Sequence, residues 1–561
     1  MPPKAKPKRV AAAERPATKT VRARWKTIAL AASFMSLAAF ASPISQANLS
    51  PVFGSIPAAA FHRTGVSIVV LLGLMVGNTS MKNYFRRDLR QFIPVLAYYI
   101  PLIQWLLFPY SAKLGPEYGP LVIESVTYYP ILFMACVATS FVLEDLNLSS
   151  PGLAPTLSST GFFVAESLSS SALPLLIGTN DFFTRSGLQL LIASLYAALS
   201  KAPYLLAVIP AMLHTMYANP HYYSNAGFKV LNRTLNANNF TILDRMDSLT
   251  GYISVLESHE NQYRVLRCDH SLLGGDWLVS ESRAKRGQTG RESIYSVFTM
   301  LESVRLVEGT SAKSDAEKSA LFVGLGIGTS PTAFIKHGIN TTIVELDPVV
   351  HHYAMKYFDL PSNHTAAIED AVGFVDTASI HHPGSYDYIV HDVFTGGAEP
   401  TALFTLEFLQ GLNKLLKDDG VVAINYAGDL TMPPPKIILD TIHTVFPTCR
   451  IFRDSPESED EPNNTFVNIV VFCTKSTVVP LTFRKPTEAD WMGSLSRRQF
   501  IPPAEKLEIH MADIHGEVKW KAQEILRRGE EAKIEKYHRE AAIRHWRVMR
   551  TVLPDAIWEN W

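Results

Sequence analysis

Cysteine is scarce in this chain, with four residues among 561. Cys136, Cys268, Cys449 and Cys473 have none of the short spacings that zinc ligands use, and Cys136 lies inside an apolar run. The sequence therefore predicts neither a metal site nor a framework of disulfides.

Net charge is also lacking, because 52 Lys and Arg residues balance 52 Asp and Glu residues. The balance hides an uneven distribution: nine Lys or Arg residues lie between Lys4 and Lys26, against the single acid Glu14. Residues 1–26 are accordingly predicted to form a disordered basic tail. A basic tail can bind nucleic acid, but one that directly precedes an apolar run is typical of a cytoplasmic positive-inside signal. No nucleic-acid partner is therefore expected.

Charged residues are few between residues 27 and 217, where long apolar runs dominate. A helix that crosses a membrane needs about 20 apolar residues. Residues 27–217 are therefore predicted to be a membrane domain of about six transmembrane helices, with the lipid bilayer as a partner. The candidate spans are residues 27–45, 64–77, 92–108, 121–143, 156–178 and 188–216.

Basic residues in short loops predict the orientation of these spans. The tail and the cluster of Lys82, Arg86, Arg87 and Arg90 should both face the cytoplasm, and two spans separate them. Six spans also return the region after residue 217 to the cytoplasm, where nucleoside cosubstrates are made. The predicted localisation is an integral, multi-pass membrane protein with its N-terminus and catalytic half in the cytoplasm. Seven spans would break this agreement.

Three ionisable residues, Glu124, Glu166 and His214, fall within the apolar runs. Such groups are costly in lipid, so they could mark a transport pathway. The sequence shows no obvious basic partner for the two acids, which favours helix-packing contacts. A transporter remains an alternative for this half of the chain.

From residue 241 the pattern changes to short segments of alternating polarity. Residues 241–310 are predicted to form a small antiparallel β unit plus a helix. The strands are expected at residues 252–256, 263–268 and 277–280, and the helix at 292–307.

Strand and helix patterns alternate over residues 319–475, which predicts a doubly wound, Rossmann-like α/β sheet. Its elements are expected at residues 320–323, 342–345, 349–358, 388–391, 403–416, 421–426 and 437–445, with a closing hairpin at 450–452 and 466–472. Residues 480–561 are predicted to be a charged helical extension, with a long surface helix over 517–550.

The most informative motif is a glycine-rich turn directly after the first strand of this sheet. Gly324, Gly326 and Gly328 stand between that strand and the start of a helix. Glycine lets the backbone approach a ligand closely and leaves the first N–H groups of the helix available. Glu345 follows about 20 residues later at the end of the next strand, where a carboxylate can accept both ribose hydroxyls. The combination predicts a nucleoside site.

Two further acids follow expected strands of the same sheet. Asp370, with Ala371, is either an adenine contact or the N-cap of a helix. Asp392 follows the strand at 388–391. Ligands of open α/β sheets bind outside the carboxyl ends of the strands, so Asp392 and Glu345 should face the same crevice.

Together these motifs resemble the spermidine and spermine synthases (polyamine aminopropyltransferases), which have a class I methyltransferase-like sheet behind a small β domain. The resemblance covers about residues 250–475. It is carried by the segments Thr250–Glu257, Arg267–His270, Gly274-Gly275, Glu292–Tyr295, the glycine turn, Lys336–Gly338, Val344–Asp347, Glu369–Ala371, Tyr386–Asp392 and Leu403–Phe408.

The resemblance implies a role for each site residue. Glu345 would bind the ribose, and Asp370 with Ala371 the adenine. Asp392 would be the catalytic base that deprotonates the attacking amine, and Tyr295 would orient that amine. The cosubstrate would be S-adenosylmethionine or its decarboxylated form, without a metal.

The chain departs from that family at two positions. Ile327 stands where the family has an acid that binds the amine of the aminopropyl donor, and Thr395 replaces the second acid of the motif that begins at Asp392. A buried ammonium without a partner is disfavoured, so Ile327 counts against aminopropyl transfer.

Three functions are therefore considered. The main prediction is a membrane-anchored, spermidine-synthase-like transferase that alkylates a small-molecule amine by aminopropyl transfer. The first alternative is an S-adenosylmethionine-dependent methyltransferase at the same site. The second is a non-catalytic transporter or scaffold with a nucleoside-binding domain, against which the retention of Glu345 and Asp392 weighs. A homo-oligomer is left open.

Overall fold

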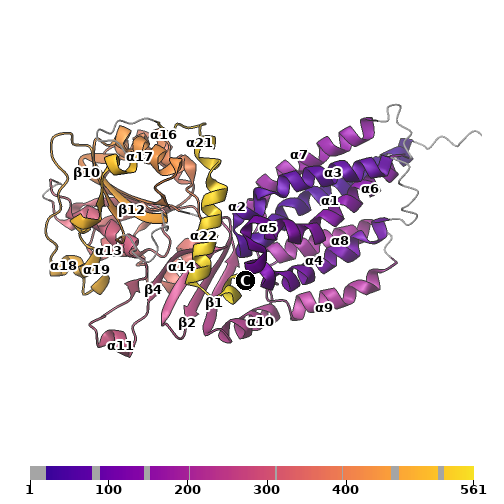
Figure 1. Cartoon of the computed structure of the whole chain (residues 1–561), viewed down its shortest axis with the longest axis horizontal. Coiled ribbons are helices and arrows are strands. Elements are labelled where there is room, and N and C mark those ends of the chain that lie inside the picture. Colours follow the sequence, from indigo (N-terminus) through magenta and orange to yellow (C-terminus); the bar gives the residue numbers. More distant parts are fainter. Residues whose placement is uncertain are drawn as a thin grey trace, which may run out of the picture.

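The computed structural model describes residues 21–78, 89–144, 152–200, 203–309, 313–394, 396–456, 466–515 and 524–561. It has a helical half, formed by the first part of the chain, beside an α/β half formed by the rest (Figure 1). Most of the basic tail, most of the basic cluster that begins at Lys82, and Thr395 lie outside the described residues.

The helical half is a bundle whose longer helices run side by side (Figure 1). Its helices are α1 (Val21–Phe53), α2 (Ser55–Ala60), α3 (His62–Asn78), α4 (Ile93–Leu107), α5 (Ser111–Val126), α6 (Tyr128–Glu144), α7 (Leu153–Leu176), α8 (Arg185–Leu199), α9 (Ile209–Tyr217) and α10 (Asn225–Asn236). Buried side chains from α1, α3, α4, α6, α7 and α8 form one apolar core.

Within the described residues, three helical segments are long and apolar enough to cross a membrane by length and composition: Arg24–Phe53, Ser55–Gly77 and Ile93–Val126. Two of the six predicted spans are interrupted. The span at 121–143 is divided between α5 and α6 at Thr127, and the span at 188–216 between α8 and α9. The sequence predicts the second interruption, because Lys201 and Pro203 allow one broken helix or two shorter ones there, but it gives no sign of the break at Thr127. The membrane domain stays a prediction.

The acids of the helical half have a basic partner, contrary to expectation. Nδ1 of His62 lies 2.7 Å from Oε1 of Glu124, and Nε2 of His62 lies 4.0 Å from Oε1 of Glu166. The Ser45 hydroxyl also donates to Glu124, and the Ser42 hydroxyl to Glu166. His62 begins α3, outside the predicted spans, so sequence reasoning did not consider it. The third residue, His214, packs its ring against Trp105.

The β unit is a five-stranded antiparallel sheet in the order β1 to β5. Its strands are β1 (Phe240–Asp247), β2 (Tyr252–Ser258), β3 (Tyr263–Cys268), β4 (Ser271–Trp277) and β5 (Glu292–Ser293). The sequence missed β1, and β4 begins six residues before the strand expected at 277–280. The predicted helix at 292–307 is instead β5, α12 (Ser296–Met300) and a 3₁₀ turn. Gly274 and Gly275, which weaken a strand pattern, account for the displaced prediction of β4.

The main sheet is mixed, with strand order β13-β11-β12-β10-β9-β6-β7-β8. The strands from β10 to β8 are parallel, whereas β12 runs antiparallel to β10. The strands are β6 (Ser319–Val323), β7 (Asn340–Glu345), β8 (Thr365–Ile368), β9 (Tyr386–His391), β10 (Leu416–Asp429), β11 (Thr448–Arg453), β12 (Phe466–Thr474) and β13 (Glu508–Ile509).

Helices cover both faces of this sheet, and each face has its own apolar core. The helices of this half are α11 (Glu281–Ala284), α13 (Thr329–Lys336), α14 (Pro348–Tyr357), α15 (Ala371–His381), α16 (Leu406–Leu415), α17 (Pro433–Val445), α18 (Glu488–Trp491), α19 (Leu495–Phe500) and α20 (Met511–His515). This is the Rossmann-like arrangement that the alternating pattern predicts.

One disulfide corrects the expectation that the cysteines are unpaired. Cys449 of β11 and Cys473 of β12 stand opposite each other in the antiparallel pair and are bonded. They are 24 residues apart in sequence, and only the pairing of the two strands brings them together.

The C-terminal extension contains shorter helices than predicted, and more of its side chains are buried. Besides α18, α19, β13 and α20, it forms α21 (Ala532–Glu535), α22 (His538–Val552) and α23 (Asp555–Glu559), and α22 lies between the two halves (Figure 1). The predicted helix over 517–550 breaks before α22, and part of it lies outside the described residues. Trp561 is 1% exposed and stacks on His221.

A buried arginine fixes this terminus to both halves. Arg267 of β3 is 1% exposed and donates to five backbone carbonyls, those of Pro51, Asp269, Ile557, Trp558 and Asn560. Burial lowers the pKa of its guanidinium to about 10.

Replacing Arg267 with alanine should therefore destabilise the protein strongly, by about 3 kcal/mol or more, because several buried carbonyls lose a charged donor. The midpoint of thermal unfolding of the purified full chain measures this. Arg528→Ala is the matched control, since Arg528 forms an exposed ion pair with Asp376 at 3.0 Å and should matter little. Equal midpoints for the two variants would contradict the role given to Arg267.

Candidate functional site

The glycine turn lies at the carboxyl edge of β6, between the end of β9 and the β unit. Gly324, Gly326 and Gly328 all have positive φ, at 88°, 55° and 81°. A Cβ on Gly324 would lie 2.1 Å from the carbonyl oxygen of Asp392, and one on Gly326 would lie 2.5 Å from that of Leu273. Both the backbone conformation and the close approach therefore require glycine.

Glu345 ends β7 and points its carboxylate at the glycine turn. It accepts the backbone N–H of Leu325 at 3.1 Å and that of Asp347 at 2.9 Å. Burial raises the pKa of Glu345 to about 7, although these amides oppose the shift. The carboxylate thus lies beside the turn, where the predicted ribose contact requires it.

Asp370 caps α15, accepting the backbone N–H of Val372 at 3.1 Å. Its side chain is exposed at the end of β8, whereas Ala371 is buried. The helix-capping alternative is therefore present in the structure. The adenine contact stays a prediction for both residues, and the capping bond leaves acceptor capacity on the carboxylate.

Asp392 follows β9 directly and lines a cavity of about 270 Å³ together with Gly324 and Ile327. Nδ2 of Asn425 donates to its carboxylate at 2.7 Å. Burial raises the pKa of Asp392 to about 6, although the hydrogen bond from Asn425 acts to lower it. Asp392 is thus a carboxylate that can accept a proton near neutral pH, beside the expected reacting end of the nucleoside.

Tyr295 stands apart from this cavity. It immediately precedes α12, and its ring packs edge-on against Phe298 at 5.7 Å. Phe298, rather than Tyr295, lines the cavity of Asp392, and Leu273 of β4 does so from the β unit. The predicted role of Tyr295 in orienting the acceptor therefore has no support from direct contact.

Sequence reasoning also missed Asn425. It lies in β10, next to β9, and the rule that ligands lie at strand carboxyl ends could have singled it out. No comparable signal exists for Leu273 or Phe298, which reach the cavity only through the docking of the β unit and α12.

Ile327 occupies an apolar environment. It is 3% exposed and belongs to a core with Val349 and Tyr353. A Cβ on Gly274 would lie 2.9 Å from its Cγ1 atom, so β4 packs directly on this side chain. The position cannot bind an ammonium group.

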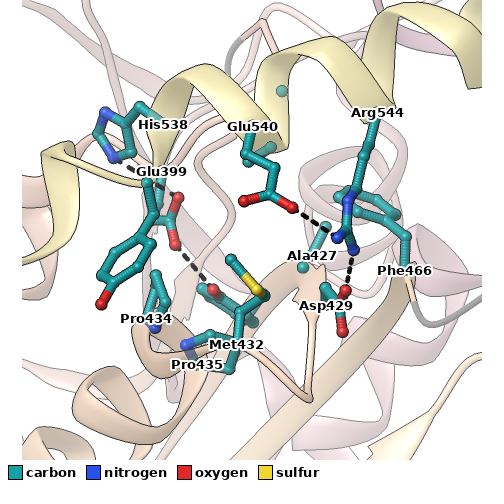
Figure 2. Close-up of a pocket in the computed structure, with 15 residues that line it drawn as sticks. Glu399, Ala427, Asp429, Met432, Pro434, Pro435, Phe466, His538, Glu540 and Arg544 are labelled. Carbon is teal, nitrogen blue, oxygen red and sulfur yellow. Dashed lines mark hydrogen bonds and ion pairs between the residues drawn. The ribbon is translucent and has the colours of Figure 1, made fainter.

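A second cavity, of about 430 Å³, opens where β10 ends (Figure 2). Glu399, Asp429 and Glu540 bring three carboxylates to it, and Phe466 adds an aromatic wall. Arg544 of α22 pairs with Asp429 and Glu540. Glu399 accepts the Tyr426 hydroxyl at 2.7 Å and lies 3.7 Å from Nε2 of His538.

The described parts of the chain contain no group of three or more His, Cys, Asp or Glu side chains placed to hold a metal ion. The chemistry available at this site is proton transfer by Asp392 next to the glycine turn, where the nucleoside site is predicted.

The comparisons with known proteins agree with the motifs. The profile of a family described as the spermine/spermidine synthase domain matches residues 302–450. An N-terminal histidine N-methyltransferase from Emericella nidulans is 42% identical over 550 residues, which cover 96% of this chain and 98% of the relative.

Two other similarities are more limited. A polyamine aminopropyltransferase from Vibrio vulnificus is 35% identical over 109 residues, 19% of this chain and 36% of that protein. The crystal structure of a probable spermidine synthase from Corynebacterium glutamicum covers 46% of this chain and 93% of its own, at 16% identity and a TM-score of 0.33.

If Glu345 binds the ribose, Glu345→Ala should weaken the binding of S-adenosylhomocysteine by about 30-fold or more, because a bidentate, charge-assisted contact is lost. Calorimetry on the purified full chain measures the change. Glu369→Ala is the control, since Glu369 is exposed nearby and should leave affinity unchanged. If Glu345→Ala lost less than about threefold in affinity for S-adenosylhomocysteine, the assignment of Glu345 to the ribose would be wrong.

Proposed function

The chain belongs to the family of the N-terminal histidine N-methyltransferase of Emericella nidulans, and on that premise we propose that it methylates a nitrogen of an N-terminal histidine, with S-adenosylmethionine as donor. It is a transferase, and the relationship extends over both halves. The acceptor is thus a peptide rather than a free small amine. A non-catalytic transporter or scaffold is not favoured, because the full-length relative is an enzyme.

Methyl transfer is favoured over the aminopropyl transfer that the motifs first suggest. The observation that carries this preference is the similarity to a methyltransferase over 96% of this chain, whereas the aminopropyltransferase from Vibrio vulnificus matches 19% of it. The apolar surrounding of Ile327 agrees with a changed donor site, because the aminopropyltransferases have an acid at that position. The family resemblance thus holds for the fold and the nucleoside site, while the transferred group differs.

Each site residue has a defined task in this reaction. Glu345 and the glycine turn bind the nucleoside, whose sulfonium supplies an electrophilic methyl carbon. An acceptor nitrogen attacks that carbon, and the bond from the methyl group to sulfur breaks. Asp392 takes the proton that the acceptor loses, and Asn425 holds the Asp392 carboxylate in place.

The cavity of Figure 2 is where we place the acceptor. It opens at the same edge of the sheet as Asp392. Its three carboxylates outnumber the one guanidinium that pairs with two of them, that of Arg544, and this excess of negative charge favours the ammonium group at a peptide N-terminus.

The localisation proposal is that the helical half anchors the protein in a membrane, with the basic tail in the cytoplasm. Support comes from the apolar helices and from the basic residues before α1. The cytoplasmic position of the catalytic half additionally needs an even number of spans. The Cys449–Cys473 disulfide opposes that position, because such bonds persist mainly in oxidising compartments. A homo-oligomer remains a prediction.

Methylation should depend on a free N-terminal histidine and on Asp392. A peptide that begins with histidine should gain one methyl group by mass spectrometry, whereas the same peptide with alanine added before the histidine should not. Asp392→Asn should lower the rate by about 10²–10⁴ while S-adenosylhomocysteine still binds, because only a carboxylate acts as the base.

The pH profile of the same assay separates a base from a structural aspartate. Asp392 accepts a proton only when ionised, so the rate should fall as the pH drops through about 6. The imidazole of the acceptor protonates in the same range, so the Asn variant should retain a shallower fall. The proposal would be overturned if Asp392→Asn methylated the peptide at a rate within about fivefold of wild type. Transfer to polyamines instead of the peptide would overturn it as well.

The position of the catalytic half can be tested in sealed microsomes. We expect added protease to remove the basic tail. Cleavage of the catalytic half without detergent would support its cytoplasmic placement. Protection, together with Cys449 and Cys473 unreactive to maleimide until reduced, would show that the number of spans is odd.

A further inference from the structure

Arg185 attaches the helical half to the β unit through two buried acids. It begins α8 and is 4% exposed, and its backbone N–H donates to Oδ2 of Asp247 at 2.8 Å. Nε of its guanidinium lies 3.2 Å from Oδ1 of Asp247, and Nη1 donates to Oδ1 of Asp269 at 2.8 Å. Asp247 ends β1 and Asp269 directly follows β3, so one side chain of the helical half holds two strands of the β unit.

These contacts fix the turn between β1 and β2, residues 248–251. The turn is closed on itself, because the N–H of Ser248 donates to the carbonyl of Gly251 and the N–H of Gly251 donates to that of Ser248. The segment between α7 and α8 packs on the turn as well: a Cβ on Gly178 would lie 2.0 Å from the carbonyl oxygen of Asp247. The position of the turn therefore depends on the helical half.

The same turn binds Asp347 of the α/β half. The hydroxyl of Ser248 donates to Oδ1 of Asp347 and that of Thr250 to Oδ2, at 2.6 Å each. The backbone N–H of Thr250 adds a third hydrogen bond, at 3.1 Å. Asp347 is 0% exposed and caps α14, so donors from the turn and from the helix together satisfy its carboxylate. The turn thus holds Asp347 in place.

Asp347 in turn orients Glu345. Its backbone N–H donates to Oε1 of Glu345 at 2.9 Å, and the N–H of Leu325 in the glycine turn donates to Oε2. A carboxylate can accept two ribose hydroxyls only within a narrow range of positions, so the groups that hold it contribute to the affinity. A continuous series of buried contacts therefore leads from α8 to the predicted ribose site.

We propose that Arg185 is a positioning residue of the nucleoside site, through which the helical half sets the affinity for the methyl donor. Arg185 holds the turn between β1 and β2, the turn holds Asp347, and Asp347 orients Glu345. The inference rests on the proposed function, in which Glu345 binds the ribose. It gives the helical half a role in donor binding that is independent of any membrane.

Coupling of this kind is reciprocal, so nucleoside binding must stabilise the attachment of the helical half to the same extent. Hydrogen–deuterium exchange on the unaltered full chain tests this. S-adenosylhomocysteine should slow exchange in residues 178–190 and 247–251, although neither segment lines the cavity of Asp392. If the ligand protected the glycine turn and left both segments unchanged, the inference would be wrong.

A double-mutant cycle separates positioning from a general loss of structure. In calorimetry, Arg185→Gln should weaken S-adenosylhomocysteine about fivefold or more in the wild-type background, but less than about twofold in the Glu345→Ala background, because Arg185 acts only through Glu345. Arg63→Gln is the matched control, since Arg63 is exposed in the first turn of α3 in the same half, and it should change neither affinity. Equal losses in both backgrounds would overturn the inference.

Ser248→Ala is a milder variant in case Arg185→Gln does not fold. It removes one donor to Asp347 and should weaken S-adenosylhomocysteine about threefold in the wild-type background only. Unchanged affinity would contradict the series of contacts and leave the proposed function intact. A wild-type chain that binds no S-adenosylhomocysteine would overturn the proposed function as well.

Discussion

The buried guanidinium of Arg267 is the contact on which the arrangement of the two halves depends. A cation this deep needs its donors satisfied, and backbone carbonyls satisfy them in place of a carboxylate. Those carbonyls come from the end of α1, from the turn after β3 and from the last residues of the chain. Segments more than 500 residues apart in sequence are thereby held at one point of the β unit.

The catalytic geometry follows from this attachment. With the β unit fixed, β4 lies over the glycine turn, where Leu273 approaches Gly326. With the C-terminus fixed, α22 lies along the cavity of Figure 2 and supplies Arg544 to Asp429. The same helix contacts α2 and α5, so the wall of that cavity is attached to the helical half.

One position shows how a shared fold serves different group transfers. Under the proposed function, the glycine turn and Glu345 bind the nucleoside, and Asp392 is the base. Ile327 joins a core with α14 and the β unit, where the aminopropyltransferases that the motifs resemble have an acid. Its burial accompanies the close approach of β4, where a Cβ on Gly274 would lie 2.9 Å from the Cγ1 atom of Ile327.

The sequence by itself determined the local features: the alternation of strands and helices, the glycine turn, Glu345 and Asp392 at strand ends, and the apolar helices. These depend on periodicity and on glycine conformation within a few residues. The tertiary structure alone decided the break between α5 and α6, the pairing of His62 with two acids, the Cys449–Cys473 bond and the surroundings of Ile327. Asn425 and Leu273 reach the surroundings of Asp392 for the same reason, because each does so through the packing of elements distant in sequence, which no local pattern encodes.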